Sequence, residues 1–378
     1  MRNIPYAKHD ITENDVDSVT SVLKSGFLTG GENVVLFEEN FRKYVQSEYA
    51  LSVSSGTAGL HLAVKALGIP KDKFVLLPSL TFAATANAVL YSGGNIEFID
   101  IDPQTLLMDI NIIEKRLLQN PDKYAGIITV DYAGLPSDVI KLKTICDKYK
   151  LWLIEDAAHS LGGVLNDDLV GNAKYSDITV FSFHPAKHIT TGEGGMITTN
   201  NPKLYEKIKL SRSHNMDRSK QQSSEEGWYY EIDDVGYNYR MSDINASLGN
   251  SQLSRINENL SNRRRLADRY TKAFENNKNI KLQSNIPNGL NAYHLYTTQV
   301  KNRKGMYDYL KSKGIYAQVH YVPLHMQPAY AKYFNASDSP LTNTENYYAG
   351  CLSIPMFPTL SLEDQDYVIG EINNFLNI

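Results

Sequence analysis

The sequence predicts an α/β protein with a mostly parallel central sheet, followed by a smaller α+β part. From residue 50 to residue 155, short apolar segments typical of buried strands alternate with helical patterns, as in parallel sheets that are covered by helices. After Asn238 the alternation ends, and a long helical pattern leads into a mixture of strands and helices. With 378 residues, 42% of them hydrophobic, the chain exceeds one typical core, so two packed subdomains are expected.

The first subdomain is expected to open with two helices, at 12–24 and 34–45, ahead of a strand at 50–54. Further strands are expected at 74–78, 96–101, 125–130, 151–155 and 178–183, and the helices between them at 60–67, 83–91, 111–118 and 139–149. In a sheet of this order, ligands gather at the carboxyl ends of the strands.

The second subdomain is expected to start at Ser242 and Asp243, where residues 242–274 read as one long helix or as a broken pair. Strands at 295–300 and 317–321 follow, with a helix at 307–313 between them. We therefore divide the chain into residues 1–241, an N-terminal arm and a large domain, and residues 242–378, a small C-terminal domain. The polar residues 217–230 lack periodicity and predict a mobile loop.

Composition and charge exclude several classes of protein. The net charge is −4 and charged residues make up 21% of the chain. The densest basic run, at 263–265, lies in a helical pattern and reads as a solvated face, so no nucleic-acid partner is expected. No stretch is long enough to span a bilayer, and residues 1–6 show no targeting run. Two lone cysteines and nine histidines without metal-ligand spacing predict a cytoplasmic enzyme without a metal site.

One lysine lies between an apolar strand pattern and a glycine-rich turn. Residues 182–195 read SFHPAKHITTGEGG, with Lys187 at their centre. A lysine held at a strand end, away from water, can lose its proton and act as a nucleophilic amine. Taken alone, the pattern equally fits an ordinary loop with a solvated lysine.

Two other segments point to the same cofactor. Asp156 ends the apolar run 151–155, and an aspartate there can pair with a protonated pyridine nitrogen. Small residues at 55–59 open a helical pattern, where free N–H groups and the helix dipole favour an anion. Each segment alone has an ordinary interpretation, as a helix cap or a turn. Together they predict pyridoxal 5′-phosphate, with Lys187 as the Schiff-base residue.

Several blocks along nearly the whole chain resemble the nucleotide-sugar aminotransferases, the DegT/DnrJ/EryC/StrS family of fold-type I pyridoxal-phosphate transferases. The blocks are FLTGG at 27–31, SGTA at 55–58, TFAATAN at 81–87, EDAAHS at 155–160 and GYNYRMS at 236–242. Two further blocks, VDYAG at 130–134 and AQVHY at 317–321, are similar to the C4-aminotransferases of pseudaminic acid synthesis. The chain departs from that subfamily at 55–58 and at Gly192, on the cofactor side of the site.

The resemblance implies a ping-pong reaction. Lys187 would move a proton between the α-carbon of L-glutamate and the cofactor, Asp156 would keep the pyridine nitrogen protonated, and 2-oxoglutarate would leave. The amino group would then pass to C4 of a UDP-linked 4-keto-6-deoxy amino sugar. Alternative substrates are a UDP-D-sugar of the bacillosamine or legionaminic acid type and a GDP-sugar as in perosamine synthesis. Alternative classes of protein are a dehydratase, in which a histidine replaces the lysine, and a non-catalytic binding protein.

The resemblance also implies roles for other residues, although each residue type has an ordinary structural interpretation as well. The residues implied at the cofactor are Gly56, Thr57, Ala58 and Ser182 at its phosphate, Phe82 over its ring, His159 beside it, and Asn238, which would reach the phosphate of a neighbouring subunit in a homodimer with shared sites. The residues implied at the nucleotide sugar are Tyr6, Gly26, Phe27, Leu28, Thr29, His320 and Tyr321, with Arg212, Arg240 and His325 as further candidates.

Overall fold

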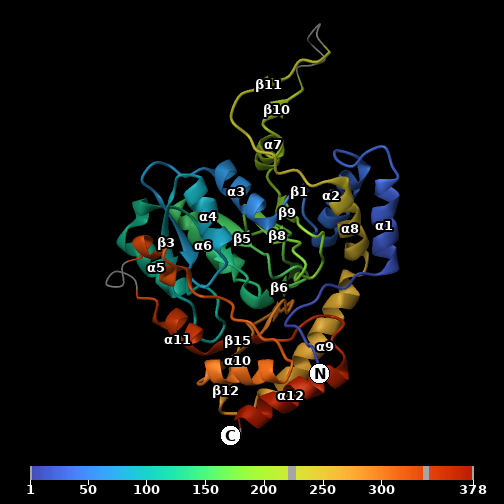
Figure 1. The fold of residues 1–378 in the computed structure, drawn as a ribbon. Coiled ribbons are helices and arrows are strands. Elements are labelled where there is room, and N and C mark those ends of the chain that lie inside the picture. The colour runs from blue at the N-terminus through green and yellow to red at the C-terminus, as the bar shows by residue number, and fades with distance from the viewer. Residues whose placement is uncertain (1, 220–226, 335–339, 377–378) are drawn as a thin grey trace.

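The computed structural model describes residues 2–219, 227–334 and 340–376. Its centre is a seven-stranded sheet in the order β1-β9-β8-β5-β4-β2-β3, covered by helices (Figure 1). The neighbouring pairs among β3, β2, β4, β5 and β8 are parallel, whereas β9 is antiparallel to β8 and β1. The expected α/β fold with a mostly parallel sheet is therefore confirmed. The strand bounds are β1 Tyr49–Val53, β2 Phe74–Pro78, β3 Asn95–Ile99, β4 Tyr124–Val130, β5 Trp152–Asp156, β8 Ile178–Ser182 and β9 Gly195–Thr199.

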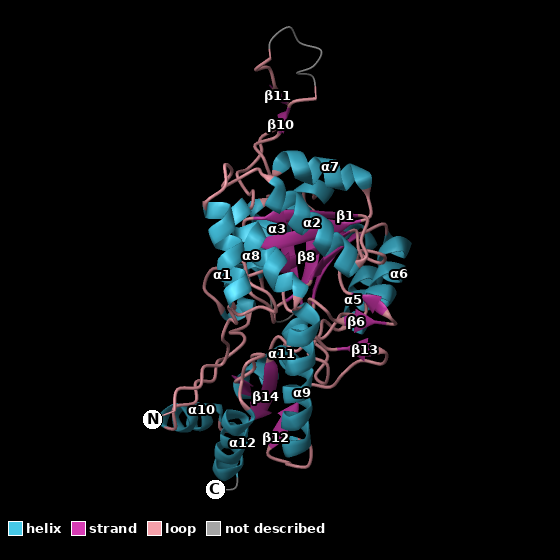
Figure 2. Cartoon of the chain, turned by 90° about the vertical axis from the view of Figure 1, so that its right-hand side faces the viewer, coloured by secondary structure: helices cyan, strands magenta, loops and turns pink. Residues whose placement is uncertain are grey.

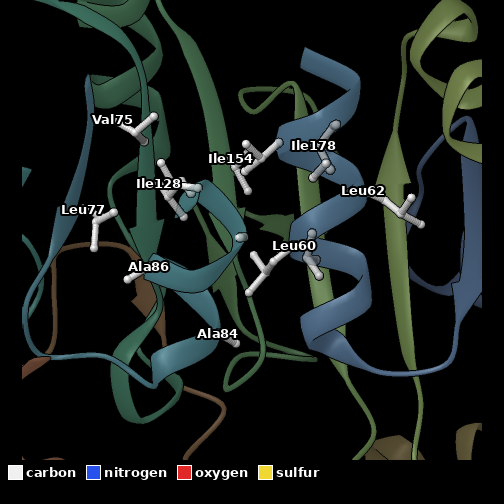
Figure 3. Close-up of a cluster of buried hydrophobic side chains, with 14 of the residues drawn as sticks. Leu60, Leu62, Val75, Leu77, Ala84, Ala86, Ile128, Ile154 and Ile178 are labelled. Carbon is white, nitrogen blue, oxygen red and sulfur yellow. The ribbon is translucent and has the colours of Figure 1, made fainter. Parts of the chain in front are cut away.

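The sheet buries both of its faces, because successive side chains of its strands point to opposite sides. On one face, residues such as Leu77, Ile128 and Ile154 pack against α3 (Gly56–Leu67) and α4 (Ala83–Tyr91), as Figure 3 shows. On the other face, their strand neighbours Leu76, Ile127 and Leu153 pack with residues of α5 (Ile110–Gln119) and α6 (Val139–Tyr149). Helix α7 (Pro202–Ser211) contacts α3.

Three helices pack together, and one of them, α2, also contacts the first strand, β1. They are α1 (Glu13–Leu23), α2 (Glu32–Val45) and α8 (Asp243–Ser254). After Arg255 the chain continues as α9 (Ile256–Phe274), which leads toward the C-terminal part in Figure 1. Residues 242–274 are thus the broken pair of helices, not one long helix.

The C-terminal part holds an antiparallel sheet in the order β12-β14-β15, with bounds Ile280–Leu282, Tyr296–Val300 and Cys351–Ile354. Its helices are α10 (Arg303–Ser312), α11 (Thr342–Gly350) and α12 (Leu362–Leu376). Ile4 packs into the core of this part, while α8 packs with α1 and α2 of the first part. Contacts thus cross the expected boundary at 241/242 in both directions, and that boundary stays a proposal.

Two sequence-based expectations are wrong in this structure. Residues 317–321 form no strand of the sheet: Gln318 makes one antiparallel bridge to Ser353 of β15. Arg263, expected on a solvated face, is only 1% exposed, because its helix is covered there by the segment around Tyr293. Within the described ranges, no helix is both long and apolar enough to cross a membrane.

The short strands β10 and β11 lie beyond α7, outside the helices that cover the central sheet, as Figure 2 shows. β10 (Met216–Asp217) pairs with β11 (Glu231–Ile232) in an antiparallel ladder. Residues 220–226 lie outside the described residues, so the expectation of a mobile loop at 217–230 stays a prediction.

The N-terminus of α2 is capped by a residue distant in sequence. Asp243, fully buried, accepts hydrogen bonds from the N–H groups of Gly31 (2.8 Å) and Asn33 (3.0 Å). Its own N–H donates to the carbonyl of Leu28 (3.0 Å). This one carboxylate therefore joins α8 to α2 and anchors the 26–29 turn.

We expect Asp243→Ala to lower the free energy of unfolding by about 2 kcal/mol, because two half-buried N–H groups lose a buried acceptor. The midpoint of urea unfolding measures this change. Asp17→Ala, at an exposed position of α1, is the control and should leave the midpoint unchanged. Equal midpoints for both variants would contradict the capping role.

Candidate active site

Lys187 lies in the connection between β8 and β9. Hydrogen bonds from the N–H groups of Phe183 to Gly194 O (2.9 Å) and of Thr191 to Phe183 O (3.0 Å) close the segment into a hairpin. The Lys187 N–H donates to His184 O (2.8 Å). Burial lowers the pKa of the Lys187 amine to about 8, while the charge of Asp156 acts in the opposite direction. The amine is therefore partly neutral near pH 7 to 8, as a nucleophile or base requires.

Asp156 ends β5, next to β8 in the sheet. Thr85 Oγ1 donates to Asp156 Oδ2 (2.8 Å), and the Ala158 N–H donates to Oδ1 (3.3 Å). Burial raises the pKa of Asp156, and these hydrogen bonds together with Lys187 oppose the rise. A buried carboxylate that lacks a full counter-charge is stabilised by an added cation. The residues therefore fit a protonated pyridine nitrogen.

Three segments converge at the start of α3. A Cβ atom added at Gly56 would lie 2.9 Å from the Ser182 Cβ, and one added at Gly195 would lie 2.8 Å from the Gly56 nitrogen. Only glycine permits this approach, which brings the Ser182 side chain beside the helix N-terminus. Such a terminus with a neighbouring hydroxyl fits a phosphate group. The Ala58 N–H, expected at the phosphate, instead donates to Ser55 Oγ (3.1 Å).

Residues expected at the cofactor and at the sugar share one wall of the site. Phe82, directly before α4, is 59% exposed, and its ring centroid lies 6.0 Å from that of Tyr321. The Ala133 N–H donates to His159 Nδ1 (3.3 Å), so His159 Nε2 carries the proton and donates to the Tyr321 hydroxyl (3.1 Å). Tyr6 packs on His320, with ring centroids 5.4 Å apart.

Other expected residues have no recorded contact with Lys187. Asn238 and Arg240 are exposed, as is the 26–29 turn. Arg212 is engaged inside the protein, where Nη1 contacts Glu38 Oε1 (2.5 Å) and Ser52 O (2.6 Å). The structure records no contact between any of these residues and Lys187, so their roles stay predictions.

His325 is buried, and both of its ring nitrogens are occupied. The carboxylate of Glu345 can only accept, so His325 Nε2 carries the proton and donates to Glu345 Oε1 (3.2 Å). Nδ1 is then the acceptor, and the Ser79 hydroxyl donates to it (2.7 Å), while Ser79 Oγ accepts from the backbone N–H of His325 (3.2 Å). His325 thus joins the loop after β2 to α11, and a contact with the sugar would have to break this network.

Sequence reasoning missed His294, whose Nε2 lies 3.5 Å from Lys187 Nζ. It completes a group of four buried histidines, which we call the imidazole cluster: His159, His188, His294 and His320. Burial is the largest cause that lowers the pKa of all four, and the charge of Lys187 adds to it; for His320 the pKa falls to about 4. The cluster is therefore neutral at pH 7. A histidine before a strand carries no signal that would have placed it here.

This sheet order, with a desolvated lysine and a buried aspartate at the carboxyl edge, defines a fold-type I enzyme that uses pyridoxal 5′-phosphate. A sequence profile of the DegT/DnrJ/EryC1/StrS aminotransferase family matches residues 9–373. The chain belongs to this family and is an aminotransferase.

Individual relatives agree with this assignment. The chain is 36% identical to the UDP-4-amino-4,6-dideoxy-N-acetyl-beta-L-altrosamine transaminase of Campylobacter jejuni over 370 residues, 97% of this chain and 95% of that protein. Its structure matches PseC of Helicobacter pylori, an aminotransferase involved in the biosynthesis of pseudoaminic acid, with a TM-score of 0.92 and 29% identity over 100% of both chains. It also matches Spr1654 of Streptococcus pneumoniae, solved in its PLP form, with a TM-score of 0.90 and 28% identity over 99% of both chains.

The lowered pKa of Lys187 makes a kinetic prediction. When the full chain, stripped of cofactor, is mixed with pyridoxal phosphate, the neutral amine is the nucleophile. Covalent capture should therefore accelerate as the pH rises through about 8, and not only near the usual lysine pKa of 10.5. Stopped-flow absorbance between pH 6 and 10.5 measures the midpoint. A midpoint near 10 would contradict desolvation of the amine.

Proposed function

We propose that this aminotransferase moves the amino group of L-glutamate to C4 of UDP-2-acetamido-2,6-dideoxy-β-L-arabino-hexos-4-ulose. The product would be UDP-4-amino-4,6-dideoxy-N-acetyl-β-L-altrosamine, a precursor of pseudaminic acid. The observation that carries the proposal is the near full-length similarity to the Campylobacter jejuni transaminase in a chain that retains a desolvated lysine beside a buried aspartate.

The chain's own residues would hold the cofactor in a defined orientation. Asp156 would pair with the pyridine nitrogen, and Lys187 would attach at the opposite end of the ring. Ser182 and the N–H groups of Gly56 and Thr57 would bind the phosphate, with Phe82 over the ring face. When bound, pyridoxal phosphate carries the amino group between the two substrates and takes up negative charge from the reacting carbon.

Lys187 would act as both base and acid. Its amine would take the proton from the α-carbon of L-glutamate, and 2-oxoglutarate would leave. In the second half of the reaction, the same amine would deliver a proton to C4 of the sugar, where the amino group arrives. An amine with a pKa of about 8 can serve in both directions, since neither of its protonation states is rare near neutral pH.

The wall formed by Tyr6, His320 and Tyr321 would bind the sugar through hydrogen bonds. Because the pKa of His320 is lowered to about 4, this residue offers no positive charge at pH 7. The pyrophosphate would therefore need a cation from elsewhere, and the exposed Arg240 is the candidate. Exposure of Phe27, Leu28 and Asn238 in a single chain supports a homodimer in which the partner completes the site. A cytoplasmic location stays a prediction.

Replacement of the lysine tests the chemistry. We expect Lys187→Ala to lower turnover by at least about 10³-fold, since the proton-transfer group is lost, and to abolish covalent cofactor attachment. Lys301→Ala, at an exposed position of the C-terminal part, is the matched control and should retain full activity. Turnover of Lys187→Ala within a few-fold of the control would refute the assignment.

The acceptor is tested by a half-reaction. The enzyme is first loaded with an amino group from L-glutamate and freed of the donor. UDP-4-keto-6-deoxy sugars of L-arabino or D-xylo configuration are then added separately. We expect the absorbance of the starting form to return with the L-arabino sugar alone. A return with only the D-xylo sugar would assign a substrate of the bacillosamine or legionaminic acid type, and no return with either would indicate another nucleotide, such as GDP.

A further inference from the structure

His294 differs from the other members of the imidazole cluster in its hydrogen bonds. His159 binds Ala133 and Tyr321, His188 Nε2 donates to Ala292 O (2.9 Å), and His320 Nδ1 contacts Ser353 Oγ (2.9 Å). His294 Nε2 faces Lys187 Nζ at 3.5 Å, and its Nδ1 is buried without a hydrogen-bond partner in the described part of the chain. A buried polar atom left unpaired costs free energy, so such atoms mark constrained sites.

The backbone around His294 is held on several sides. The N–H groups of Ala292 and Leu295 donate to the carbonyls of Gly134 (2.9 Å) and Ala133 (3.1 Å). Arg263 Nη1 donates to the carbonyls of Tyr293 (3.2 Å) and His294 (3.3 Å). These contacts fix the backbone that carries the imidazole.

Tyr293, directly before His294, has a φ of 50°, which is uncommon for a bulky residue and costs about 1 kcal/mol or more. Its N–H donates to Asn291 Oδ1 (2.7 Å). A Cβ atom added at Gly134 would lie 2.8 Å from the backbone nitrogen of His294, so glycine is needed opposite this turn. Local strain together with close backbone packing directs the His294 ring at the lysine.

The groups around Lys187 leave few acceptors for its amine. Asp156 of β5 is the opposite charge that acts on it. The charge of Lys187 also acts on the four imidazoles, which are neutral, and the charged Arg263 donates to the His294 carbonyl. A neutral imidazole offers one lone pair, and that of His294 is adjacent to Nζ.

We propose that His294 is a positioning residue that accepts a hydrogen bond from the Lys187 amine whenever that amine is not joined to the cofactor. The inference rests on the proposed role of Lys187. A neutral acceptor would hold the amine in place without competing for protons. The same hydrogen bond keeps the ammonium form of Lys187 from turning toward Asp156. Asp156 then stays available to pair with the cofactor.

The test compares two kinds of substitution. His294→Phe keeps a buried aromatic ring but removes the acceptor, whereas His294→Gln keeps an acceptor near the position of Nε2. Loss of a hydrogen bond to the charged amine should lower the pKa of Lys187 by about 0.5 to 1 unit. Misplacement of the freed amine should lower kcat by about 10- to 100-fold, with the KM for L-glutamate nearly unchanged.

The pKa is read from the pH dependence of covalent capture by the full chain stripped of cofactor, and kcat and KM from steady-state assays of the loaded enzyme. We expect the capture midpoint to fall for His294→Phe and to stay at the wild-type value for His294→Gln. His294→Leu replaces the Phe variant if that variant does not fold. The inference would be overturned if the variant without an acceptor kept the wild-type capture midpoint and kcat. It would also be overturned if kcat and the midpoint fell equally in the Phe and Gln variants. Covalent capture by Lys187→Ala would instead refute the proposed role of Lys187.

Discussion

The amine of Lys187, in the connection after β8, and the carboxylate of Asp156, at the end of β5, both lose hydration at the carboxyl edge of the sheet. The rest of the site is arranged around these two groups. Burial lowers the pKa of Lys187 and raises that of Asp156, because each charged form loses hydration. Both losses are offset when a cofactor supplies a carbonyl carbon to one and a protonated ring nitrogen to the other. Parallel pairing of β5 with β8 brings the two residues to the same edge of the sheet.

The imidazole cluster follows from the same constraint. A histidine that gained a proton beside Lys187 would place two like charges in a desolvated space, and the lysine is among the causes that lower the pKa of each member. Neutral imidazoles can still donate and accept, and three of them connect segments distant in sequence: His159 to the loop after β4, His188 to Ala292, and His320 to β15. The cluster thus joins the two parts of the chain without adding charge at the amine.

The residues that sequence reasoning found are those with a local signal. Asp156 ends one apolar strand pattern and Lys187 follows another, and the order of these patterns places both at one edge of a parallel sheet. β9 was missed because it begins at Gly195, the last residue of the glycine-rich turn that closes the segment 182–195, and was read together with that turn. His294 was missed because its contact with Lys187 spans 107 residues of sequence. At 317–321, the sequence suggested a strand, but only Gln318 pairs with β15.

Arg263 shows how tertiary structure can reverse the meaning of a charge run. Its guanidinium contacts the carbonyls of Tyr293, His294 and Met356, and burial lowers its pKa to about 10, so it is still charged at pH 7. A buried cation held by carbonyl dipoles rather than by a carboxylate keeps a positive field in the interior. That field is among the causes that lower the pKa of His188 and His294. The same side chain therefore anchors the backbone of His294 and helps to keep its ring neutral. A neutral ring has a lone pair that can accept a hydrogen bond from the Lys187 amine.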